Sequence, residues 1–290
     1  MRQITPISVL LRSLRELLVF FRRQPVAAVS SVMLVLLLSM AIFSPWLAPH
    51  DPIKITITQR LMPPSAKYLL GTDELGRDIL SRVIYGARIS LYVGFLGVLA
   101  GTTVGAILGV ISAYRGGRTD MYLQRVMDVL LAFPTIILAL AIMAVLGRGI
   151  NNVALALAVP FVARTNRVVR SAALSVSELD YVEAARSIGC TRWRIILRHV
   201  LPNCMAPYLI ISTSLLGTAI LVESSLSFLG LGIPPPHPAW GRSLSEAMPY
   251  LRLAPWASIF PGIAISMSVF AVNLLGDYLR DTLDPRLRLR

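Results

Sequence analysis

Few side chains in this sequence could bind a nucleotide, a metal or a reacting substrate, and their spacing suits none of these tasks. Neither lysine follows a glycine, as a phosphate-binding loop requires, so any nucleotide chemistry that drives the protein would belong to another chain. The histidines are isolated, and the cysteines are too far apart for a Cys-x-x-Cys pair. We therefore expect no catalytic residue, bound metal or cofactor in this chain. The residues considered are Lys54, Lys67, His50, His199, His237, Cys190 and Cys204.

Two acidic residues are candidates for a functional role. Glu183 lies among basic neighbours in a stretch of small residues, where it either pairs locally or contacts a partner protein. Glu223 lies in the outer part of a long apolar segment, and an ionised carboxylate in hydrocarbon costs roughly 2.5–3.5 kcal/mol. It should therefore face protein, water or the membrane boundary. It either lines the path of a substrate's ammonium group or simply reaches the surface.

The apolar spacing between residues 181 and 203 predicts two short helices that position Glu183. The first ends at Gly189, because glycine readily adopts the left-handed conformation at a helix end, and the second stops at Pro202. Small residues on the first helix would let a partner approach its backbone closely. An amphipathic loop on the membrane surface is the alternative. The predicted apolar faces are Tyr181, Ala184, Ala185 and Ile188 in the first helix and Trp193, Ile196, Leu197 and Val200 in the second.

The composition indicates an all-α integral membrane protein. Hydrophobic residues make up 55% of the 290 residues and charged residues 15%, which is too apolar for a soluble domain. Apolar runs of about twenty residues recur, and they are continuous rather than alternating, which favours helices over a barrel. The net charge of +13 could suggest nucleic acid, but the arginines lie at the ends of apolar segments. That placement is typical of orientation in a membrane, so we expect membrane lipid and no nucleic acid as a partner.

We expect six transmembrane helices, at residues 26–48, 90–114, 129–146, 153–169, 205–229 and 255–275. The segments are then a cytoplasmic N-terminal stretch at 1–25, the first transmembrane helix at 26–48, a periplasmic or extracellular excursion at 49–89, a five-helix core at 90–279 and a cytoplasmic tail at 280–290. The first apolar run is too long for a cleavable signal peptide. Pro134 should bend the third span, and the fourth crosses if its helix continues to Val169 with Arg164 and Arg167 snorkelling inward.

The distribution of positive charge favours both termini in the cytoplasm. With that orientation lysine and arginine are more numerous on the inner segments, as the positive-inside rule requires. The stretch around Glu183 then faces the cytoplasm.

Glycines recur every fourth residue in the second span, at Gly97, Gly101, Gly105 and Gly109. A ridge without side chains lets two membrane helices touch closely, so helix packing is favoured over a substrate-lining groove.

Three separated motifs resemble the permeases of binding-protein-dependent ABC importers. Glu183-Ala-Ala, followed by Gly189 and the ending His199-Val-Leu-Pro-Asn203, is similar to their "EAA loop". The stretch Gly71-Thr-Asp-Glu-Leu-Gly-Arg-Asp-Ile-Leu-Ser-Arg82 and the segment from Asn273 to Pro285 are similar to two further family signatures. The chain looks like the second, C-type, permease of dipeptide, oligopeptide or nickel importers.

The resemblance implies a type I importer permease in a bacterial cytoplasmic membrane, with a coupling helix in the loop at 171–203. The expected partners are a homologous second permease, two ATPase subunits that bind ATP and magnesium, and an extracytoplasmic substrate-binding protein. Closure of the ATPases would push on the Glu183 helix and turn the cavity from outward-facing to inward-facing. The expected ATPase-coupling residues are Tyr181, Glu183, Ala184, Ala185, Arg186 and Gly189, and the expected pathway residue is Glu223.

Other functions fit the sequence less well. A carrier of nickel or a metal chelate is the alternative within the same permease type, and His237 in an outer loop could touch such a substrate. An ion-coupled secondary transporter would need buried charge pairs and often shows internal repeats. A membrane enzyme would need a reactive group of residues. The substrate itself is not specified by this chain.

Overall fold

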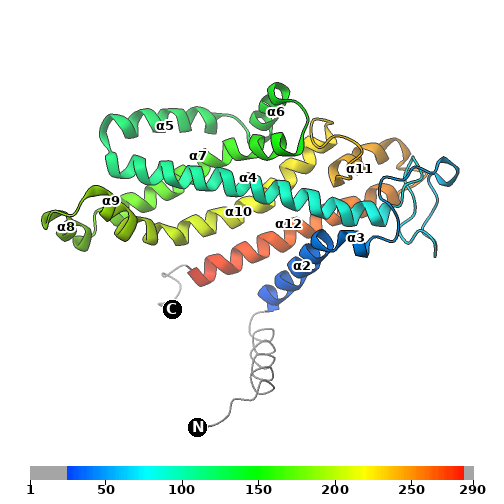
Figure 1. Cartoon of the computed structure of the whole chain (residues 1–290), viewed down its shortest axis with the longest axis horizontal. Coiled ribbons are helices and arrows are strands. Elements are labelled where there is room, and N and C mark those ends of the chain that lie inside the picture. The colour runs from blue at the N-terminus through cyan, green and yellow to red at the C-terminus, as the bar shows by residue number, and fades with distance from the viewer. Residues whose placement is uncertain (1–24, 284–290) are drawn as a thin grey trace, which may run out of the picture.

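The computed structural model describes residues 25–283, and every regular element within that range is a helix. Figure 1 shows long helices side by side along the long axis, with short helices at both ends. The prediction of an all-helical chain is thus confirmed for the described residues. The predicted segments 1–25 and 280–290 fall largely outside them. The helices are α2 (Pro25–Ile42), α3 (Ser44–Leu47), α4 (Ile79–Arg115), α5 (Gly117–Ala132), α6 (Thr135–Leu146), α7 (Ile150–Ser177), α8 (Asp180–Ser187), α9 (Arg192–Ile195), α10 (Leu201–Phe228), α11 (Trp240–Ala247) and α12 (Trp256–Leu283), with the short 3-10 or π elements η1 (Ile57–Gln59), η2 (Ile196–Val200) and η3 (Met248–Tyr250).

Helix α4 begins earlier than the sequence suggested, and its cap explains why. The Asp78 carboxylate accepts hydrogen bonds from the Ser81 backbone N–H at 2.9 Å and from the Ser81 hydroxyl at 2.6 Å. An aspartate at this position satisfies backbone donors that the first turn leaves unpaired. The helix therefore starts at Ile79 rather than near Ser90, and the end of the predicted excursion is helical.

The predicted glycine ridge packs α4 directly onto the backbone of α7. A Cβ added at Gly101 would lie 2.5 Å from the Ala158 carbonyl oxygen, and one at Gly105 would lie 2.5 Å from that of Val162. Gly97 and Gly109 meet the α7 backbone in the same way. Helix packing, and not a substrate groove, is confirmed as the role of these glycines.

The third predicted span is broken rather than gently bent. Phe133 and Pro134 are extended, with ψ of 137° at both residues, and the axes of α5 and α6 differ by 95°. Proline disfavours a helical conformation in the residue before it, so the break falls at Phe133. The predicted bend at Pro134 therefore separates two helices.

Helix α7 continues unbroken past Val169, as the fourth span required, and its arginines bind α5 and α6. Arg167 pairs with Asp128 at 2.5 Å, and Arg164 donates to the Thr135 hydroxyl at 2.8 Å. The charges on this helix are thus satisfied by neighbouring helices within the subunit.

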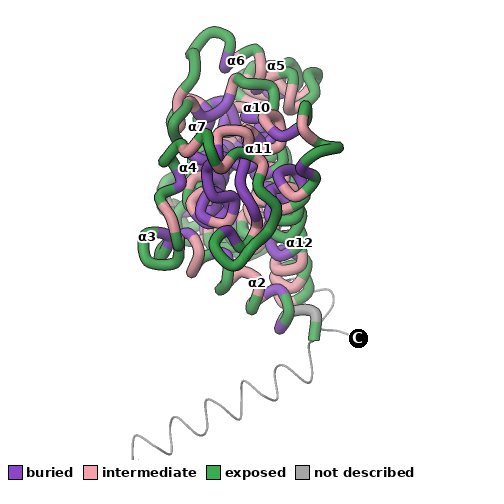
Figure 2. The backbone as a smooth tube through the Cα atoms, turned by 90° about the vertical axis from the view of Figure 1, so that its right-hand side faces the viewer, coloured by how far each residue is buried: buried purple, intermediate pink, exposed green. Residues whose placement is uncertain are grey.

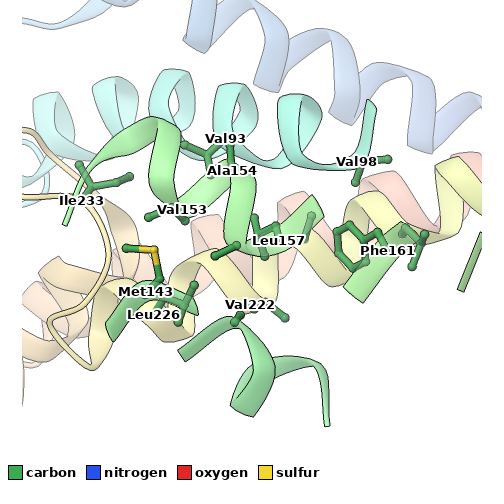
Figure 3. Packing of buried hydrophobic residues seen from close by; sticks show 14 of the residues in the cluster. Val93, Val98, Met143, Val153, Ala154, Leu157, Phe161, Val222, Leu226 and Ile233 are labelled. Carbon is green, nitrogen blue, oxygen red and sulfur yellow. The ribbon is translucent and has the colours of Figure 1, made fainter. Parts of the chain in front are cut away.

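Three buried apolar clusters hold the bundle together. One joins α4, α6, α7 and α10 and includes Met143, Leu157 and Phe161, which Figure 3 shows between the ribbons. A second joins α2, α4, α11 and α12, and a third joins the C-terminal ends of α4 and α7 to α8, α9 and α10. Seen end-on in Figure 2, the buried backbone lies in the middle of the bundle and the exposed backbone around it.

The membrane-spanning helices can be compared with the predicted spans. Three of the described helices are long and apolar enough to cross a membrane, namely Ile79–Arg115, Arg192–Phe228 and Trp256–Thr282, and the bent pair α5–α6 adds a fourth. The first predicted span corresponds to a shorter apolar helix, Ala28–Ile42, and the fourth to α7 with its arginines.

The glycine ridge gives a direct test of the α4–α7 contact. Gly101→Ala should lower the stability of the subunit by about 1–3 kcal/mol, because the added methyl group meets backbone that cannot move independently. The measurement is the thermal unfolding midpoint of the purified protein in detergent. The matched control is Gly94→Ala on the same helix, where the new Cβ would lie 3.6 Å from the Ile220 side chain. Equal midpoints for the two variants would contradict the close contact.

Candidate functional site

The predicted coupling residues lie on α8, at the end of the bundle shown on the left in Figure 1. The helix spans Asp180–Ser187 and carries Asp180 and Glu183 in its first turn and Arg186 in its last. These charges match the partial charges of the helix ends and favour a helix of this length. The side chain of Glu183 is exposed and has no hydrogen-bond or ion-pair partner among residues 25–283.

The four residues predicted to share one face of the first helix are divided between its packed and its exposed sides. Val182 and Ala185 are buried, whereas Tyr181, Ala184 and Ile188 are exposed, with Ile188 at 81%. Apolar side chains lie on both sides of this short helix, so their spacing alone could not tell which side faces inward. The expectation that Ala185 belongs to the outward surface is wrong, since it packs in the third apolar cluster.

Gly189 ends α8 in the left-handed conformation, as predicted. Its φ is +82°, and the N–H of the following Cys190 donates to the Ala185 carbonyl at 3.1 Å. Such a bond satisfies one of the carbonyls that a helix end leaves unpaired.

The second of the two short helices predicted between residues 181 and 203 does not stop at Pro202. Helix α9, the π turn η2 at Ile196–Val200 and α10 follow one another without an interruption, and Pro202 lies in the first turn of α10. Proline cannot donate a backbone N–H to the preceding turn, and here it lies just after the π turn, where the α-helical hydrogen-bond pattern is already interrupted. Of the predicted apolar face, Val200 is buried, whereas Trp193 and Leu197 are exposed, and Ile195, which lies outside that face, is buried.

Two side chains of α8 tie it to the spans. The Tyr181 hydroxyl accepts a hydrogen bond from the Asn203 amide at 3.1 Å, and its ring lies 5.9 Å from that of His199. The Arg186 guanidinium lies 5.9 Å from the centre of the Tyr114 ring, near the end of α4. Movement of α8 is therefore linked to both α4 and α10.

Glu223 lies inside the subunit, fully buried on α10. Its carboxylate accepts hydrogen bonds from the hydroxyls of Ser90 at 2.9 Å and Ser227 at 2.8 Å, and Ser224 lies at 3.5 Å. Because Ser90 belongs to α4, Glu223 joins the two helices. It does not reach the surface of the described chain, and its role in the pathway stays a prediction.

Comparison with known proteins identifies the family. A family model described as "Binding-protein-dependent transport system inner membrane component" matches residues 101–289, and one for the "N-terminal TM domain of oligopeptide transport permease C" matches residues 14–64. The chain belongs to this family of importer permeases. It is accordingly a multi-pass inner-membrane subunit of an ATP-binding-cassette importer.

Individual relatives match over most of their length. The dipeptide transport system permease protein of Alkalihalophilus pseudofirmus is 40% identical over 94% of this chain and 90% of its own. The glutathione transport system permease protein of Pectobacterium atrosepticum is 42% identical over 92% and 89%, and the di/tripeptide transport system permease protein of Pseudomonas aeruginosa is 42% identical over 88% and 86%.

The fold is that of a solved permease. The structure titled "Inward facing conformations of the MetNI methionine ABC transporter" matches with a TM-score of 0.59 and 17% identity, over 71% of this chain and 98% of that one. The prediction of a type I importer permease fold is confirmed.

At the opposite end of the permease the structure reveals a group of ion pairs that the sequence did not predict. Arg77 contacts Asp73 at 2.6 Å and both Glu74 and Glu246 at 2.8 Å, and the buried Arg82 lies 3.5 Å from Glu246. In the sequence, the stretch from Gly71 to Arg82 stands out only for its resemblance to a family signature. Nothing in the sequence indicates that it contacts Glu246, which lies far along the chain on α11. This group, called the outer ion cluster after the orientation expected from the sequence, consists of Asp73, Glu74, Arg77, Arg82, Arg242 and Glu246.

The two glutamates that contact Arg77 differ in protonation behaviour. Burial raises the pKa of Glu74, and the neighbouring Asp73 raises it further. Burial also acts to raise the pKa of Glu246, but the hydrogen bond from Arg242 and the charges of Arg77 and Arg82 outweigh it and hold that pKa below its usual range. A carboxyl group whose pKa is lowered by folding stabilises the fold above its unfolded pKa, and this stability is lost as the pH falls through the folded pKa.

The difference between these glutamates can be tested by substitution. Glu246→Gln should lower the free energy of unfolding by about 3 kcal/mol near neutral pH, because it removes the charged partner of the buried Arg82 on α11 and one of the carboxylates that contact Arg77. The matched control Glu74→Gln removes an equally short contact with Arg77 and should cost much less, since Glu74 is held less firmly in its charged form.

The measurement is thermal unfolding of the purified subunit at neutral pH and at a pH below the pKa values of its carboxyl groups. The loss caused by Glu246→Gln should shrink at the acid pH, where wild-type Glu246 is itself protonated. Equal losses for both variants at neutral pH would show that Glu246 does not bridge the cluster.

Proposed function

We propose that this permease imports small peptides and that α8 receives the movement of a cytoplasmic ATPase. The observation that carries the proposal is the pair of opposite faces on α8. One face, with Val182 and Ala185, packs on the spans, and the other, with Tyr181, Glu183 and Ala184, is exposed.

The packing of α8 supports transmission of force. Its inward residues share an apolar cluster with Val110 of α4 and Val169 of α7, and Tyr181 and Arg186 add contacts to α10 and α4. Packed interiors are nearly incompressible, so a push on the exposed face moves the spans rather than deforming the contact. A rigid reorientation of the helices then exchanges outward-facing and inward-facing cavities.

The remaining partners follow from the family. The subunit forms half of the pathway beside a homologous second permease, two ATPase subunits bind ATP and magnesium, and a binding protein delivers the substrate on the outside. Both termini lie in the cytoplasm with α8. Figure 1 shows α8 and the outer ion cluster beside α11 at opposite ends of the bundle, so with α8 in the cytoplasm the cluster would face the outside.

The relatives support a peptide as the substrate. Three that match along most of their length are named for transport of dipeptides, of di- and tripeptides and of glutathione. The decisive observation is which compound the binding protein of the intact complex retains on copurification. A peptide identified by mass spectrometry is expected, and a metal chelate in its place would overturn this part of the proposal.

Charge reversal on α8 tests the coupling role. Glu183→Arg should leave the complex assembled but lower ATP-driven uptake at least about tenfold, because a partner surface that accepts a carboxylate would repel a guanidinium. The measurement is uptake and ATPase activity of the complex reconstituted in liposomes. The control is Glu178→Arg, the same change of charge on an exposed residue after the end of α7. Uptake at the wild-type rate in Glu183→Arg would remove this residue from the mechanism.

A further inference from the structure

An unassigned groove of about 510 Å³ opens beside the outer half of α4. Its main wall is one face of that helix, formed by Tyr85, Arg88, Ile89 and Tyr92, whose positions i, i+3, i+4 and i+7 lie on one side of a helix. The opposite walls come from three other parts of the chain, namely residues 51–53, Ile150 at the start of α7, and residues 237–238. Small-molecule sites in proteins have this size and this mixture of apolar walls with a few polar groups.

The charged groups of the groove favour an anionic ligand. The arginines of the outer ion cluster on and near the same helix, Arg77 and Arg82, contact carboxylates. Arg88 is exposed, and no residue in the described part of the chain forms an ion pair or hydrogen bond with its guanidinium. The one acid in the lining, Asp51, accepts a hydrogen bond from the backbone N–H of Ile53 at 2.9 Å and does not pair with Arg88. A guanidinium without a partner at the wall of a groove is suited to bidentate binding of a carboxylate.

The apolar groups of the groove indicate what should adjoin that carboxylate. Tyr85 and Tyr92 lie one turn before and one turn after Arg88 on the same helix face, and Ile89 lies between them. These side chains offer flat apolar surface next to the charge. A carboxylate attached to a carbon that bears an apolar or aromatic side chain, as at the C-terminus of a peptide, matches this arrangement.

We propose that this groove binds the C-terminal carboxylate of the transported peptide, with Arg88 as the residue that contacts it. The inference rests on the proposed peptide substrate and adds a binding position within this chain. The groove lies beside residues 51–53 and near the outer ion cluster. It is therefore on the proposed outer side, where a binding protein would release the peptide.

The test measures binding of two probes, the dipeptide alanyl-phenylalanine and its C-terminal amide, to the complex of both permease and both ATPase subunits in lipid nanodiscs. Binding protein and nucleotide are omitted so that the permease alone discriminates. The wild-type complex should bind the acid at least about tenfold more tightly than the amide, because the amide loses a charge-assisted contact. In Arg88→Gln the acid should bind no better than the amide, and Arg88→Lys should retain part of the preference.

Arg148→Gln serves as the matched control, because Arg148 is an exposed arginine in the turn before α7 and does not line the groove. This variant should keep the wild-type preference. Equal binding of acid and amide to the wild-type complex, no measurable binding of the acid, or an unchanged preference in Arg88→Gln would each overturn the inference. If Arg88→Gln abolished the stimulation of ATPase activity by the binding protein but left the preference for the acid unchanged, the inference would be overturned, and Arg88 would instead contact a carboxylate of the binding protein.

Uptake of alanyl-phenylalanine by liposomes that contain the complex and its binding protein separates the two proposals. If the wild-type complex takes up the dipeptide but binds the acid no better than the amide, peptide import stands and the proposed groove site is wrong. Absence of ATP-driven dipeptide uptake in the wild-type complex removes the proposed function itself.

Discussion

The close approach of α4 and α7 is the contact on which the rest of this permease depends. In a membrane there is little hydrophobic drive between helices, so association rests on tight packing and on hydrogen bonds between them. Glycines at every fourth position bring the α4 backbone against the α7 carbonyl groups of Ala158 and Val162. The pair then supplies the surface on which α10 packs, and the C-terminal ends of the two helices carry α8.

Polar contacts complete what the glycines begin. Several charged or polar side chains bind a partner on another helix, as the buried Glu223 does with Ser90 and the exposed Arg167 does with Asp128. Such pairs hold helices in register, because an unpaired polar group in a medium of low polarity is costly. The same logic operates at the outer end, where the outer ion cluster fastens the excursion to α4 and α11.

Local features of this fold could be predicted from the sequence, whereas the choice between alternative contacts could not. The ridge around Gly101 and the helix end at Gly189 follow from what glycine permits in a backbone. The buried side of α8 did not follow, since Ala185 and Ala184 are equally able to face inward and packing against α4 and α7 decides between them. The contact of Arg82 with Glu246 did not follow either, because the tertiary fold brings Glu246 to it from far along the chain.

The two ends of the subunit are joined by a single element. Helix α4 runs unbroken through 37 residues, about 55 Å at 1.5 Å per residue. Near its inner end Tyr114 lies against Arg186 of α8, and near its outer end it carries Arg82 of the ion cluster and Arg88 of the groove. Because the glycine ridge binds α4 to α7 along its length, the two helices move together. A displacement of α8 at one end of α4 is therefore passed to the groove near the other end, as the proposed coupling and substrate binding would require.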